Sequence, residues 1–179
     1  ETYGSLSLSK AESSTPASSS PSTGPPENVP RQHMLVLGMH RSGTSALTGA
    51  LARCGAYVGE AHELLPAASD NAAGFFERED VIEVTQGLLN GGGGDWWRLA
   101  RLDLDTVPAD TLASCRGRFS EIVEKLDRQG AWVIKDPRLC LVLPCLLDLV
   151  DRPVAVIVHR NPLVVARSLH RRDGSAVAE

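Results

Sequence analysis

The chain has 179 residues, of which 42% are hydrophobic and 22% are charged, which is typical of a globular domain. Its formal net charge of −4 argues against a general nucleic-acid-binding protein, because such proteins need a basic surface. The longest apolar stretch, residues 139–147, is too short to span a bilayer and is interrupted by Pro144. We therefore expect no membrane span and no nucleic-acid partner.

The first 30 residues differ from the rest of the chain, because 17 of them are Ser, Thr or Pro. Such a segment cannot bury enough apolar surface to offset the entropy lost on ordering. We predict a disordered tail or linker over residues 1–30, with an ordered N-terminal arm as the alternative. The chain begins with Glu1 rather than Met, and a linker predicts a further domain upstream.

The four cysteines contain no C-x-x-C pair, which argues against a zinc site or a redox dithiol. A disulfide framework is not expected, because a chain of this length can bury its own core. Small buried thiols in a reducing compartment are the favoured interpretation, and they indicate a cytoplasmic location.

Strand and helix signals alternate from residue 31 onward. Residues 33–38 form a short apolar run ending in Gly, which predicts a buried strand. Residues 42–54 have helical character, and Gly55 stands where a helix C-terminal cap belongs. A second helix is predicted over residues 79–90, followed by a glycine-rich loop over 91–94.

The next elements follow the same alternation. Asp110 is predicted to cap a helix whose apolar residues share one face: Leu112, Cys115, Phe119, Ile122, Val123 and Leu126. Residues 131–135 and 153–158 are predicted strands, and the apolar segment 139–149 between them is a predicted buried helix that Pro144 must kink or start. Asn161 and Pro162 are typical of a helix start, with Asn as the cap.

The three predicted strands are short, apolar and separated by helices. This pattern predicts an α/β fold, a three-layer sandwich with a parallel sheet covered on both faces. Ligands of such sheets bind at the carboxyl ends of the strands. The loops after Leu37, Ile134 and Val158 are therefore the places to look for a site.

The loop after the first strand, residues 38–45, reads Gly-Met-His-Arg-Ser-Gly-Thr-Ser and leads into a helix. Backbone N–H groups at a helix N-terminus attract anions, and Arg41 adds a forked charge. The spacing nearly matches a Walker A loop, but Thr44 stands where its Lys belongs. The loop predicts a phosphate site that is not an ATPase loop, with an ordinary tight turn as the alternative.

The loop after the third strand carries Arg160 at the strand end and Ser168 eight residues later. Eight residues are about two helical turns, so Ser168 falls on nearly the same side as the helix start. Arg160 and Ser168 are therefore predicted to converge on one anion.

Together these two loops resemble the sulfotransferases that use 3′-phosphoadenosine-5′-phosphosulfate (PAPS), in particular the bacterial sulfotransferase-like group. In that family an R/K-S-G-T-[TS] loop binds the 5′-phosphosulfate, and an Arg with a Ser eight residues later binds the 3′-phosphate. The matching residues are Arg41, Ser42, Gly43, Thr44 and Ser45 for the first element and Arg160 and Ser168 for the second. The resemblance covers residues 33–172 and implies a fold like that of P-loop nucleoside triphosphate hydrolases.

The resemblance also implies a role for the loop after the second strand. Lys135 matches a family Lys that stabilises the transferring sulfuryl group, whereas the usual catalytic His is replaced by Pro137. Since Pro cannot accept a proton, the base must lie elsewhere, as in the tyrosylprotein-like branches that use a Glu. The alternative for Lys135 and Arg138 is a solvated strand end with a local Asp136 pair.

The favoured base is Glu77, which follows two aromatic residues that would shelter its carboxyl group and raise its pKa. Glu60 and His62 rank behind it, and a role as an acid at a helix N-terminus is the alternative for Glu77. Trp96 and Trp97 are predicted to line an acceptor pocket or to pack in the core.

These residues imply sulfuryl transfer from PAPS to a hydroxyl or amine, with PAP as product and no metal. Carbohydrate, lipid, peptide and small-molecule acceptors all stay open. The alternatives are a kinase-like binder of ATP and magnesium and a non-catalytic sulfotransferase-like relic. The family's further Arg/Lys-Gly loop is missing after Ser168, so residues 31–179 are expected to be a domain truncated at its C-terminus.

Overall fold

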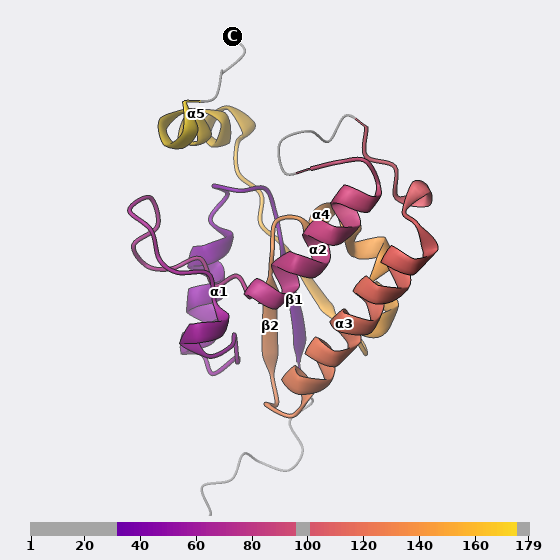
Figure 1. The fold of residues 1–179 in the computed structure, drawn as a ribbon. Coiled ribbons are helices and arrows are strands. Elements are labelled where there is room, and N and C mark those ends of the chain that lie inside the picture. Colours follow the sequence, from indigo (N-terminus) through magenta and orange to yellow (C-terminus); the bar gives the residue numbers. More distant parts are fainter. Residues whose placement is uncertain (1–31, 96–100, 175–179) are drawn as a thin grey trace, which may run out of the picture. The chain divides into compact units, whose positions relative to one another are not determined.

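The computed structural model describes residues 32–95 and 101–174 (Figure 1). The prediction for residues 1–30 lies outside the described residues, and so do those for Trp96 and Trp97. None of the helices in the described ranges combines the length and the apolar character needed to cross a bilayer.

Three parallel strands form the sheet, in the order β2-β1-β3. The central strand is β1 (His33–Leu37), between β2 (Trp132–Lys135) and β3 (Val154–Ile157). In this register Leu35 pairs with Ile134 on one side and with Ala155 on the other. The prediction of an α/β fold with a parallel sheet is confirmed.

Alternate side chains of the sheet enter two different cores. Leu35 and Ile134 belong to the larger core, which they form with residues of α2 (Glu79–Gly91) and α3 (Ala109–Asp127). Val36 belongs to a smaller core, against which residues of α1 (Thr44–Arg53) pack. Figure 1 shows α1 on one side of the sheet and both α2 and α3 on the other.

The helix α3 buries the apolar stripe predicted for it, namely Cys115, Phe119, Ile122, Val123 and Leu126, with Leu112 partly buried beside them. Its start differs from the prediction, because Pro108 occupies the cap position and the helix begins at Ala109. Asp110 therefore lies inside the first turn, where its negative charge suits the positive end of the helix dipole.

The apolar segment 139–149 is not one kinked helix. The short helix α4 (Leu139–Val142) gives way to two 3₁₀ turns, Leu143–Cys145 and Leu147–Leu149. Pro144 stands in the first of these turns, and its missing N–H group and its ring prevent an α-helix from continuing.

The last helix, α5 (Pro162–Asp173), begins as predicted, because the Asn161 Oδ1 atom accepts a hydrogen bond of 2.9 Å from the Leu163 N–H group. It lies beyond the carboxyl ends of the strands (Figure 1). We expected helices to cover both faces of all three strands. This expectation is wrong for β3, in which Ile157 and Val154 are 75% and 44% exposed. Within the described ranges α5 turns toward the end of the sheet and leaves the β3 side chains uncovered.

Gly38 marks the closest backbone approach at this end of the sheet. A Cβ atom there would lie 2.6 Å from the Val158 carbonyl oxygen, and the φ angle of +148° is one that side-chain-bearing residues rarely adopt. The loop that follows β1 can therefore leave the sheet close to β3 only with glycine at this position.

Gly38→Ala is expected to lower the free energy of unfolding by about 1–3 kcal/mol, because backbone atoms must shift to admit the methyl group. The matched control is Gly117→Ala in α3, where a Cβ atom would meet nothing within 4 Å. The control should raise the free energy of unfolding by about 0.5–1 kcal/mol, as expected for Gly to Ala inside a helix. Urea titrations give both values, and two equally stable variants would contradict the close approach.

Candidate functional site

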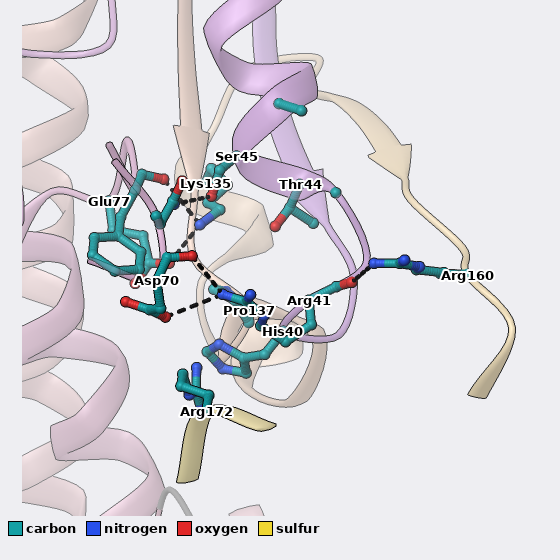
Figure 2. A pocket seen from close by; sticks show the side chains of 14 residues that line it. His40, Arg41, Thr44, Ser45, Asp70, Glu77, Lys135, Pro137, Arg160 and Arg172 are labelled. Carbon is teal, nitrogen blue, oxygen red and sulfur yellow. Dashed lines mark hydrogen bonds and ion pairs between the residues drawn. The ribbon is translucent and has the colours of Figure 1, made fainter. Parts of the chain in front are cut away.

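A pocket of about 220 Å³ lies at the carboxyl ends of the strands (Figure 2). The three strand-end loops line it together with the segment 70–77 and the end of α5. Of the predicted site residues, the pocket wall includes Arg41, Gly43, Thr44, Ser45, Glu77, Lys135 and Arg160. Ser42 and Ser168 are buried nearby and are not part of the wall.

The loop after β1 leaves the N-terminus of α1 facing this pocket. Gly43 holds the cap position in the left-handed conformation with a φ angle of 98°, and no side chain caps the helix. The first helical hydrogen bond runs from the Leu47 N–H group to the Gly43 carbonyl oxygen, at 3.1 Å. The N–H groups of Thr44 and Ser45 precede that bond, so they are placed to donate to an anion in the pocket.

Arg41 joins the first loop to α5 and to the segment around residue 70. Its Nε atom donates to the Ser168 hydroxyl at 3.0 Å, and its Nη1 atom lies 3.1 Å from a carboxylate oxygen of Asp70. The Arg41 carbonyl oxygen in turn accepts a hydrogen bond of 2.8 Å from Arg160 (Figure 2). The structure thus brings Arg41, Arg160 and Ser168 together, although Ser168 reaches the pocket only through Arg41.

Lys135 and Glu77 form a buried ion pair across the pocket from Arg160 (Figure 2). The Lys135 Nζ atom lies 2.5 Å from Glu77 Oε1, and the two residues are 3% and 4% exposed. Burial raises the pKa of Glu77, while the positive charge of Lys135 opposes that rise. The solvated strand end considered for Lys135 is therefore wrong.

The Asp136 pair with Arg138 is present but buried. Asp136 is 0% exposed, and it accepts hydrogen bonds from the Thr85 hydroxyl at 2.6 Å and from Arg138 Nη1 at 2.8 Å. Because α2 carries Thr85, this carboxylate anchors the loop after β2 to that helix. Arg138 Nη1 also lies 3.9 Å from Glu77 Oε2, the carboxylate oxygen that does not face Lys135.

Phe75 and Phe76 anchor the segment that carries Glu77. The Phe75 carbonyl oxygen accepts a hydrogen bond of 3.0 Å from Lys135 Nζ. Phe76 has a positive φ angle of 56°, and its ring packs so tightly on α1 that a Cβ atom at Gly49 would lie 3.0 Å from it. These contacts hold the segment before α2 against both the sheet end and the first helix.

The two other candidate bases lie elsewhere. Glu60 and His62 are exposed at the 3₁₀ turn Ala61–Glu63, and neither belongs to the pocket wall. The Glu60 N–H group donates to Glu63, which also pairs with the buried Arg78 at 2.9 Å.

Four polar residues of the wall were not singled out from the sequence: His40, Asp70, Asn71 and Arg172. Arg172 lies one helical turn beyond Ser168, so the spacing of four residues on α5 is a signal that could have found it. Asp70 carries no such signal, because its place beside Arg41 depends on the path that residues 64–77 take in the folded chain.

His40 is a neutral side chain among cations. Burial is the main cause that lowers its pKa from 6.5 to about 3, and the charges of Arg138, Lys135 and Arg172 add to the effect. Asp173 opposes the shift without cancelling it. His40 therefore stays uncharged through the neutral and mildly acidic range.

No protein-family model, curated protein or solved structure matches the chain. Residues 32–95 and 101–174 contain no group of three or more His, Cys, Asp or Glu side chains that could hold a metal ion. The chemistry of the site thus has to be inferred from its own side chains, which are mainly cations, hydroxyls and helix N–H groups.

Breaking the ion pair from one side should destabilise the protein. Glu77→Gln leaves the Lys135 ammonium buried without its counter-charge, so we expect the free energy of unfolding to fall by about 3–5 kcal/mol. Glu77→Gln combined with Lys135→Met should recover a large part of that loss, because no uncompensated charge remains. Urea titrations of the single and double variants give the coupling energy, and additive losses would show that the two groups do not interact.

His40 should make the stability depend on pH. Its pKa of about 3 in the folded state lies below the ordinary 6.5, so the unfolded chain binds the proton more readily. Stability is then lost as the pH falls below about 6.5, by up to roughly 1.4 kcal/mol per pH unit. Between pH 7 and pH 5, His40→Gln should lose about 2 kcal/mol less than the wild type in urea titrations. Equal losses would mean that His40 is not held neutral.

Proposed function

We propose that this chain is a PAPS-dependent sulfotransferase with a fold like that of P-loop nucleoside triphosphate hydrolases. The observation that carries the proposal is one pocket in which Arg41, Lys135 and Arg160 surround the N-terminus of α1. Two anionic ends of one nucleotide would need such separated cationic groups. The parallel sheet, with the pocket at the carboxyl ends of its strands, agrees with this class of fold.

Each cationic group has a role in the proposed reaction. Arg41 and the N–H groups of the first helical turn would bind the 5′-phosphosulfate and neutralise charge on the departing phosphate. Lys135, held in place by Glu77, would stabilise the sulfuryl oxygens in the transition state. Arg160 would bind the 3′-phosphate, and Ser168 would support this end of the site by orienting Arg41.

The transfer replaces one S–O bond by another. The bond between the sulfur and the phosphate oxygen of PAPS breaks, and a bond forms between the sulfur and the acceptor oxygen. PAP leaves with the electron pair of the broken bond, and the acceptor hydroxyl loses its proton. Glu77 would accept that proton, a role that the pKa increase caused by burial favours. Positioning and charge stabilisation would supply most of the rate enhancement, as in phosphoryl transfer.

The nucleotide preference tests the proposal. PAP should bind with the same affinity in magnesium and in EDTA, and AMP, which lacks the 3′-phosphate, should bind more weakly. Arg160→Ala should weaken PAP binding at least tenfold and AMP binding much less, because a charge-assisted hydrogen bond contributes about 1.5–3 kcal/mol. Isothermal titration calorimetry measures each of these affinities.

The matched control is Arg167→Ala, which removes the same charge from an exposed position of α5 outside the pocket wall. It should leave PAP binding nearly unchanged. Magnesium-dependent binding and turnover of ATP would instead support a kinase-like nucleotide site. If Arg160→Ala weakens PAP and AMP binding equally, Arg160 does not bind the 3′-phosphate and instead supports the loop after β1.

A further inference from the structure

A second hollow, of about 150 Å³, borders the pocket described above. Its apolar wall comes from three separate segments, with Met39 after β1, Leu89 in α2, and Cys140 and Leu141 in α4. Two further residues, His40 and Pro137, belong to the walls of both cavities. The cationic pocket and the apolar hollow are thus neighbours that share one wall.

The hollow is largely apolar, and its volume is sufficient for one aromatic ring. The side chains of Met39, Leu89, Cys140 and Leu141 offer no strong hydrogen-bond partner. A ligand with many hydroxyl groups would lose more hydrogen bonds to water there than the two polar residues of the wall, His40 and Arg138, could replace. A cavity of about 150 Å³ lined by aliphatic side chains holds a benzene-sized molecule.

We propose that the sulfuryl acceptor is a phenol, whose aromatic ring occupies the hollow between Met39, Leu89 and Leu141 and whose hydroxyl group meets Glu77 past His40 and Pro137. This inference rests on the proposed sulfotransferase function and names its acceptor class. The hydroxyl is the nucleophile, its oxygen forms the new bond to sulfur, and its proton passes to Glu77.

The two carboxylate oxygens of Glu77 have different roles in the proposed reaction. Oε1 lies 2.5 Å from Lys135 Nζ and holds that cation in the pocket. Oε2 lies on the side of Arg138, at 3.9 Å from its Nη1 atom, and Arg138 also belongs to the wall of the hollow. A hydroxyl entering from the hollow therefore approaches the carboxylate oxygen that Lys135 does not occupy. Arg138 favours the phenolate that develops as the proton leaves.

The neutral charge of His40 is compatible with its place in the wall that the two cavities share. A protonated imidazole at this position would add a further positive charge beside those of Lys135, Arg138 and Arg172, and burying that charge next to an apolar hollow would be costly. The imidazole is neutral instead, and it contributes an uncharged ring to the walls of both cavities.

The first test measures binding of phenol to the nucleotide-free protein by NMR titration. We expect saturable binding that Leu141→Trp weakens at least tenfold, because the larger side chain fills the hollow. Met39→Trp should act in the same way from another part of the wall, and since Met39 is 53% exposed this variant should not disturb the core. The control Leu147→Trp adds the same side chain at a position that is 42% exposed and outside the hollow, and it should bind phenol like the wild type.

The second test measures turnover of PAPS with phenol and with glucose. Phenol should exceed glucose at least 100-fold in kcat/KM, and Leu141→Trp should lower kcat/KM for phenol while PAP affinity stays unchanged. Glucose turning over as well as phenol would overturn the proposal, and so would unchanged phenol binding in both filled variants. A protein that binds phenol in the hollow but fails to bind PAP would disprove the sulfotransferase function and leave the aromatic-ring site standing.

Discussion

The buried ion pair between Lys135 and Glu77 is the constraint on which the rest of the site depends. Both side chains are almost fully removed from water, so each alone would carry a large desolvation cost. Their contact, together with the hydrogen bond from Lys135 to the Phe75 carbonyl oxygen, joins the end of β2 to the segment that precedes α2. Since Phe76 in that segment packs on α1, one ion pair connects the sheet, the first helix and the mouth of the pocket.

Charge is distributed unevenly over this chain. The formal net charge is −4, yet the pocket wall carries Arg41, Lys135, Arg160 and Arg172. Within the wall, Glu77 faces Lys135 and Asp70 faces Arg41. Each acid is thus matched to one base, while the N-terminus of α1 adds partial positive charge without a side chain. The local excess of cationic groups, rather than the overall charge, is what suits the pocket to a multiply charged anion.

Local patterns predicted those parts of the fold that depend on few neighbours. The strands β1 and β2 follow from short apolar runs, and the apolar stripe of α3 follows from helical periodicity. The exposure of β3 could not be predicted, because an apolar run does not show which element covers it. The pocket positions of Arg41 and Lys135 followed from strand ends, whereas those of His40 and Asp70 depend on segments that meet only in the folded chain.

The wall that the two cavities share combines an apolar residue with a neutral polar one. Pro137 and His40 stand in the same shared wall, one contributed by the loop after β2 and the other by the loop after β1. A proline ring needs no hydrogen-bond partner, so it can line the apolar side of the wall without leaving a polar side-chain group unsatisfied. The imidazole supplies the polar group that the proline lacks, and burial, with the charges of the surrounding cations, lowers its pKa and keeps it uncharged. The wall therefore separates a cationic pocket from an apolar hollow without placing an additional buried charge between them. Beside this wall, Glu77 combines a raised pKa with a second carboxylate oxygen, Oε2, that lies on the side of Arg138.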